Sequence, residues 1–143
     1  MAEEIIQATA EAEAIDIMQN SGGIRVAASF DIATAEGKAK AYNAGIAADY
    51  KVDDCIGDAV ELVDFYMEPI EFVNEETGEI EYRPHVILFA TDGRTFEGQS
   101  KGLVSSVQRL SQVGYFDGNP FTVEFCERKA KLGKMFVLKV VTD

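Results

Sequence analysis

The stretch VILFATDGRTFEGQSKGLVSSVQRLSQVG, residues 86–114, contains a tight hairpin followed by an amphipathic helix. Asp92-Gly93 is a strong hairpin signal, because glycine supplies without strain the positive φ that a tight turn needs. Ser100 is a suitable helix N-cap, apolar residues then recur at three- and four-residue spacing, and Gly114 is a suitable end. This stretch therefore predicts two strands and a helix in succession.

The sequence on either side extends this pattern to five strands. Upstream, the apolar side of the run 59–67 changes parity around Asp64, which predicts a bulge or a sharp bend. The polar turn 74–79 lies between two apolar segments and predicts a second hairpin. Downstream, apolar residues alternate over 121–125 and again near the end of the chain. The order is β-β-β-α-β-β, and we predict a mostly β protein with the five-stranded oligonucleotide/oligosaccharide-binding (OB) barrel, whose helix lies between the third and fourth strands.

The sequence before residue 50 predicts additions to this barrel. Alternating apolar residues over 24–30 predict an extra N-terminal strand. The alanine-rich segment 33–48 is interpreted as a loop with helical content, because Gly37 and Gly45 weaken a long helix. Residues 1–20 hold five acidic and no basic residues. We therefore expect an acidic N-terminal arm over 1–22, flexible or a short helix, and one OB domain over 23–143.

The bulk composition limits where the protein acts. A chain of 143 residues fits one domain with a substantial core. Its longest apolar runs are far shorter than the roughly 20 residues that span a bilayer, and acids occupy the place of the basic start of a secretory signal. We expect a cytoplasmic protein without membrane contact. Cys55 and Cys126 are accordingly expected to be reduced thiols.

Charge is divided unevenly along the chain. The net charge of −12 alone argues against nucleic acid, because phosphate contacts need Lys and Arg. Residues 1–93, however, hold five basic against twenty acidic residues, whereas 94–143 hold eight basic against five acidic. The distribution leaves two interpretations open, an ordinary solvated surface and a cationic binding region in the second half.

No catalytic pattern is found in the sequence. His85 is the only histidine, and the two cysteines lack the close spacing of a zinc site. Neither a Walker loop nor a GxGxxG motif occurs. Acidic pairs such as Asp53-Asp54 lie beside turns and suit solvated surface. We therefore expect no enzyme, no metal and no cofactor.

Aromatic and basic residues interleave on the predicted strands, a combination that suits single-stranded nucleic acid. Rings stack on bases and cations follow the phosphates. For any single Phe a place in the core is the alternative, and the lysines between the last two strands, Lys134 among them, could be a plain solubilising turn. The candidate nucleic-acid-binding residues are Tyr50, Lys51, Tyr66, Tyr82, Arg83, Arg94, Phe96, Lys101, Lys129 and Lys131.

Short motifs in residues 24–112 give the chain a family resemblance. They are a Lys-x-Tyr-Asn-Ala element at 40–44, a glycine step at Gly57, the polar hairpin 75–79, the Asp-Gly hairpin 92–96 and Ser-Lys-Gly at 100–102. In these motifs the chain resembles the single-stranded DNA-binding proteins of tailed bacteriophages.

The resemblance implies a protein that coats single-stranded DNA during phage replication or recombination, in an infected bacterial cell, with little sequence specificity. Proteins of this class often recruit partners through an acidic C-terminal tail, whereas here the acidic segment is N-terminal. We expect that segment to contact phage or host replication or recombination proteins, and a homodimer remains open. The alternative is a protein-interaction or assembly module on an OB-like scaffold.

Overall fold

The computed structural model describes residues 26–130 and 133–142, so the predictions for the segment 1–22 and for Lys131 lie outside the described residues. From residue 59 on, the predicted order of three strands, a helix and two strands is confirmed. The elements are β1 (Ala27–Ala28), α2 (Ala35–Ile46), β2 (Tyr50–Lys51), the 3-10 helix η1 (Val52–Cys55), β3 (Ala59–Val73), β4 (Ile80–Ala90), β5 (Thr95–Gly98), α3 (Lys101–Val113), β6 (Phe121–Ala130) and β7 (Gly133–Val140).

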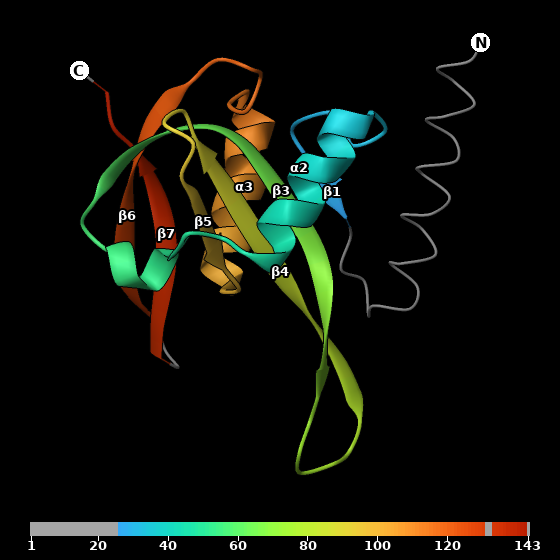
Figure 1. The fold of residues 1–143 in the computed structure, drawn as a ribbon. Coiled ribbons are helices and arrows are strands. Elements are labelled where there is room, and N and C mark those ends of the chain that lie inside the picture. Colours follow the sequence, from blue (N-terminus) through green and yellow to red (C-terminus); the bar gives the residue numbers. More distant parts are fainter. Residues whose placement is uncertain (1–25, 131–132, 143) are drawn as a thin grey trace.

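The strands form one curled sheet in the order β2-β5-β4-β3-β6-β7, with β1 paired to β3 (Figure 1). All neighbours are antiparallel except β2 and β5. Within the described residues β2 and β7 are the outer strands, so the sheet is an open half-barrel. Helix α3 lies against β7 on the open side, where the Ser106 hydroxyl accepts a hydrogen bond from the Leu138 amide. The fold is OB-like, with two short strands added.

The sequence signals that fix the central elements act as predicted. The β3–β4 register shifts between Leu62 and Asp64, which is the predicted bulge. Gly93 adopts φ 93° in the β4–β5 turn. The Ser100 hydroxyl accepts a hydrogen bond from the Leu103 amide at the start of α3, and Gly114 ends that helix in the left-handed conformation.

The concave side of the sheet holds the main core. Leu62, Leu88 and Phe125 are fully buried there beneath apolar residues of α3 and η1. The bulge allows Leu62 and Phe65 to point to the same side although they are three residues apart. Cys55 lies in this core as a free thiol, and Cys126 is a half-buried free thiol on β6.

The convex side is covered by a helix that the sequence did not predict. Residues 35–46 form α2 rather than a loop, and Ala41 and Ala44 pack on Tyr66, Ile87 and Phe89. The glycines serve close packing, because a methyl group added at Gly37 would collide with the backbone carbonyl of Asp31. Thr34 caps the helix by accepting a hydrogen bond from the Gly37 amide at 3.0 Å. Of the predicted extra strand over 24–30, the first two residues lie outside the described part of the chain, and among the rest only Ala27–Ala28 are paired as a strand.

Strands β3 and β4 continue beyond the body of the molecule as a long hairpin, which Figure 1 shows projecting away from the rest of the fold. Pro69 and Pro84 lie opposite each other at its base. Pro69 comes two residues after Met67, the last β3 residue paired with β1, and Pro84 comes two residues before Val86, the first β4 residue paired with β5. Because proline has no N–H, neither residue can donate to an added strand, and within the described residues the hairpin beyond this pair is two-stranded.

No helix within the described residues is long and apolar enough to cross a membrane.

Candidate nucleic-acid interface

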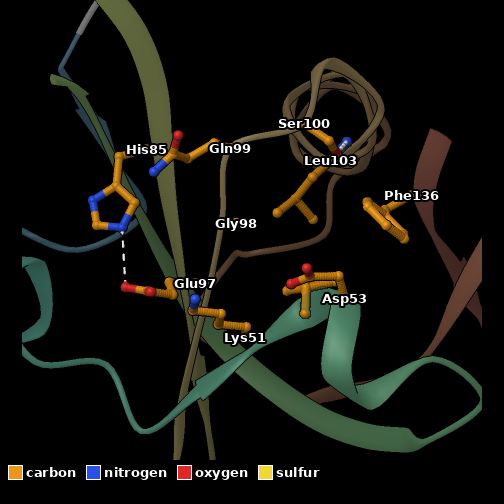
Figure 2. A pocket seen from close by; sticks show the side chains of 10 residues that line it. Lys51, Asp53, His85, Glu97, Gly98, Gln99, Ser100, Leu103 and Phe136 are labelled. Atoms are coloured by element: carbon orange, nitrogen blue, oxygen red, sulfur yellow. Dashed lines mark hydrogen bonds and ion pairs between the residues drawn. The ribbon is translucent and has the colours of Figure 1, made fainter. Parts of the chain in front are cut away.

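A cleft of about 320 Å³ lies where the half-barrel is open, between the β2–β5 edge and β7. Figure 2 shows His85 and Gln99 on one side of it and Phe136 on the other, with Lys51 and Asp53 below. The start of α3, at Ser100 and Leu103, completes its wall. Apolar, charged and amide groups thus converge on one concave surface, the usual character of a binding site.

One exposed ring lies on β2, the strand at this edge of the sheet. Tyr50 is 46% exposed, and its ring stacks on Phe96 with centroids 5.4 Å apart and planes at 25°. The Arg94 guanidinium lies 5.9 Å from the Tyr50 centroid and 5.2 Å from that of Phe96. Asp92 holds Arg94 through a 2.7 Å ion pair. The outer surface of Tyr50 therefore offers a stacking platform beside a fixed cation.

Several of the cationic candidates lie around the same opening. Lys51 follows Tyr50 and lines the cleft, and Lys101 is exposed at the start of α3. Lys129 and Lys134 are exposed, directly opposite each other in the β6–β7 hairpin, and share a sheet face with Phe136. Glu127 pairs with Lys134 at 3.2 Å. The open side therefore has cations on both walls. Arg94, Lys51 and Lys101 belong to the wall formed by β2, β5 and the start of α3, and Lys129 and Lys134 belong to the β6–β7 wall.

Two candidate rings are buried. Phe96 is 1% exposed and packs edge-on against Phe125 in the concave core. Tyr66 is 8% exposed beneath α2, and its hydroxyl donates a hydrogen bond to Glu68 at 2.9 Å. Burial, followed by this contact with Glu68, raises the pKa of Tyr66. Neither ring has a face open to a base, because α2 and η1 cover positions that the sequence alone leaves open.

Tyr82 and Arg83 lie on the projecting hairpin and point to opposite faces. Tyr82 is half-buried and shares the face that continues from the concave core. Arg83 is exposed on the other face, with its guanidinium 3.9 Å from the centroid of Phe72. The sequence places the two residues side by side, but Tyr82 continues the face of the concave core, whereas Arg83 shares its face with His85, which also lines the cleft.

His85 connects the cleft to the polar groups under α2. Its Nε2 lies 3.2 Å from a carboxylate oxygen of Glu97, drawn as the dashed line in Figure 2. Its buried Nδ1 faces Glu68 at 3.8 Å, too long for a hydrogen bond, so charge attraction is the main contact there. The Glu68 and Glu97 carboxylates raise the pKa of His85 despite its burial, and His85, followed by Tyr66, lowers the pKa of Glu68.

Sequence reasoning missed several cleft residues. Phe136 supplies a half-buried ring from β7, and Gln99 and Ser100 supply amide and hydroxyl groups able to reach base edges. Phe136 alternates with core residues, so its pattern alone predicts core. Within the part of the chain that the structure describes, no group of three or more His, Cys, Asp or Glu side chains could hold a metal ion.

One comparison with known proteins finds a family that this chain matches. The family description "Phage Single-stranded DNA-binding protein" matches residues 18–140, most of the chain. Searches of curated proteins and of solved structures returned no match. The match begins before the described residues and ends with the last strand, so it covers every element of the half-barrel. The chain therefore belongs to the phage single-stranded DNA-binding protein family, and its ligand is single-stranded DNA.

Proposed function

We propose that this protein coats single-stranded DNA during phage replication or recombination, with little sequence specificity and without catalysis, in the cytoplasm of the infected bacterium. The exposed Tyr50 ring, which stacks on Phe96 with the Arg94 guanidinium beside both rings, is the observation that carries the proposal. Any base can stack on a ring, and lysines bind the phosphates, which are the same at every position, so neither contact selects a sequence.

The strand would follow the open side of the half-barrel. We place its backbone against Arg94, Lys51 and Lys101, and against Lys129 and Lys134 on the facing wall. One base stacks on Tyr50, and the cleft between Gln99 and Phe136 is large enough for another base. Tyr82 at the base of the projecting hairpin extends this path. Tyr66 and Phe96 have no part in it, and Arg83 lies on the opposite face of the hairpin from Tyr82.

A fluorescent dT oligomer titrated at two salt concentrations tests this placement. Stacking contributes about 1–3 kcal/mol per base, so Tyr50→Leu should weaken binding roughly 5- to 160-fold. Tyr42→Leu is the matched control, because Tyr42 is 69% exposed on α2, which covers the convex side. Lys51→Gln should lower the salt slope by about 0.7, the value for one phosphate contact of a single strand. Equal losses for the two tyrosine variants would rule out the Tyr50 platform.

For the acidic segment 1–22 we propose contact with phage or host replication or recombination proteins. Deleting it should leave the affinity for a short dT oligomer unchanged and remove binding of a basic partner protein. A changed salt slope for the oligomer would instead show that the segment competes with DNA for the cations. Sedimentation of the DNA-free protein would decide the open question of a homodimer.

A further inference from the structure

The end of the projecting hairpin differs in charge from the proposed DNA path. We define the arm tip as residues 71–81, which hold five glutamates and no basic residue. Three large apolar side chains are exposed on it, Phe72 at 37%, Val73 at 56% and Ile80 at 56%. Five carboxylates repel a phosphate backbone, whereas exposed apolar side chains beside charge are typical of a protein contact. The arm tip is therefore suited to a protein surface that is basic and apolar.

The molecule carries a groove of that character on another face. It measures about 840 Å³ and lies between α3 and strands β6 and β7. Val113, which is 76% exposed, and the half-buried Met135 and Val137 supply apolar surface. Arg109, Arg128 and Lys139 are exposed around it, and none of the described residues that line it is acidic. We call it the α3–β7 groove.

We propose that the arm tip of one copy docks in the α3–β7 groove of the next copy bound to the same DNA strand. Glutamates would meet arginines and lysine, and Val73 and Ile80 would cover Val113 and its neighbours. A molecule cannot make this contact with itself, because the hairpin extends away from the body that carries the groove (Figure 1). Because the arm tip and the groove are different surfaces, the contact can repeat from copy to copy in a row along the strand, whereas a reciprocal exchange of arms between two copies would close a dimer.

The small size of the contact explains why it would form only between copies bound to the same DNA strand. Eleven residues of a hairpin bury less than the roughly 1,000 Å² of a stable interface, so copies should stay separate in free solution. Neighbours on one strand experience millimolar effective concentrations, at which a weak contact is occupied. The proposal thus deepens the proposed function and rests on it, by giving strand coating a source of cooperativity.

The test compares a dT oligomer that holds one copy with one that holds several. The parent should bind the long oligomer with at least tenfold cooperativity per neighbour. Val73→Ser/Ile80→Ser should remove that factor and leave short-oligomer affinity within twofold. Val113→Glu should do the same from the groove side, and Ile46→Ser, at an equally exposed apolar position on α2, should change neither value.

Charge reversal gives a second measurement. Arg109→Glu/Arg128→Glu and Glu76→Lys/Glu79→Lys should each abolish cooperativity, whereas one chain that carries all four changes should regain most of it. Rescue is expected only where the two sets of residues meet between copies.

Each contrary outcome has a distinct meaning. If the parent binds the short oligomer but shows no cooperativity, or if Val73→Ser/Ile80→Ser keeps it, the arm-to-groove contact is wrong and DNA binding stands. If deletion of residues 1–22 removes cooperativity and the arm-tip changes do not, the acidic N-terminal segment occupies the groove. If Val113→Glu weakens the short oligomer equally, the groove takes DNA itself. If the parent binds neither oligomer, the proposed function fails.

Discussion

The two faces of the curled sheet are built from alternate residues of the same strands, yet they differ in chemistry. The concave face is purely apolar where Leu88 and Phe125 pack under α3. The convex face, under α2, mixes apolar contacts with the Tyr66, Glu68 and His85 network and with a 2.6 Å ion pair between Lys40 and Asp64. The difference suggests that the concave face supplies most of the stability, while the convex face fixes the strands that end in the cleft.

The largest expected effect is on the concave face. Phe125→Ala would remove a fully buried ring that packs edge-on against Phe96 at 5.2 Å, and such a change costs about 3–5 kcal/mol of unfolding free energy. Urea unfolding followed by circular dichroism would measure it, with Val141→Ala at an exposed position as control. A loss below about 1 kcal/mol would mean that the concave core is not the main source of stability.

The two glycines of α2 test how the convex face is held. Gly37→Ala forces a methyl group against the Asp31 carbonyl, which is backbone and must move, at a cost of roughly 1–3 kcal/mol. At Gly45 the nearest atom is a side-chain oxygen of Glu68, 2.9 Å from the position of the added methyl, and that side chain can move. Helix propensity favours alanine there, so Gly45→Ala should cost less than about 0.5 kcal/mol. Equal losses in thermal melts would contradict a close contact specific to Gly37.

Sequence reasoning succeeded where the signal was local. The Asp92-Gly93 turn, the Ser100 cap and the bulge near Asp64 depend on neighbouring residues only, and each is confirmed. Helix α2 was missed because Gly37 reads as a helix breaker until the close approach of Asp31 is known. The burial of Tyr66 follows from the same helix, and that of Phe96 from η1 and Tyr50. The cleft joins residues 51, 85, 99 and 136, which only the tertiary fold brings together.

A smaller effect is expected from one hydroxyl group on the convex face. Tyr66→Phe keeps the ring under α2 and removes the 2.9 Å hydrogen bond to Glu68, whose side chain is 30% exposed and can bind water instead. The loss should be about 1 kcal/mol or less. Tyr66→Ala, by contrast, would also empty the space under α2 and should cost several times more. Similar losses for the two variants would mean that the hydroxyl rather than the ring holds this position.

The smallest expected effect is a pH-dependent change in stability that comes from His85 and Glu68 on the convex face. The pKa of His85 is raised above 6.5 by Glu68 and Glu97, so the stability it gives is present below pH 6.5 and is lost as pH rises through its folded pKa. The pKa of Glu68 is lowered below 4.5, mainly by His85, so its contribution is present above pH 4.5 and is lost on acidification. Both residues therefore contribute to stability between about pH 4.5 and pH 6.5.

The stability difference between the parent and His85→Gln should therefore shrink between about pH 5.5 and about pH 8.5. Because Glu68 and Glu97 are about one-third exposed, solvent screening keeps this change small. Melting temperatures at the two pH values would measure it. Phe125→Ala provides the comparison, since the concave face should lose the same stability at both. A His85→Gln difference independent of pH would mean that the ring contributes by packing and not by charge, and the Lys40–Asp64 ion pair would then be the main charged contact that distinguishes the convex face from the concave one.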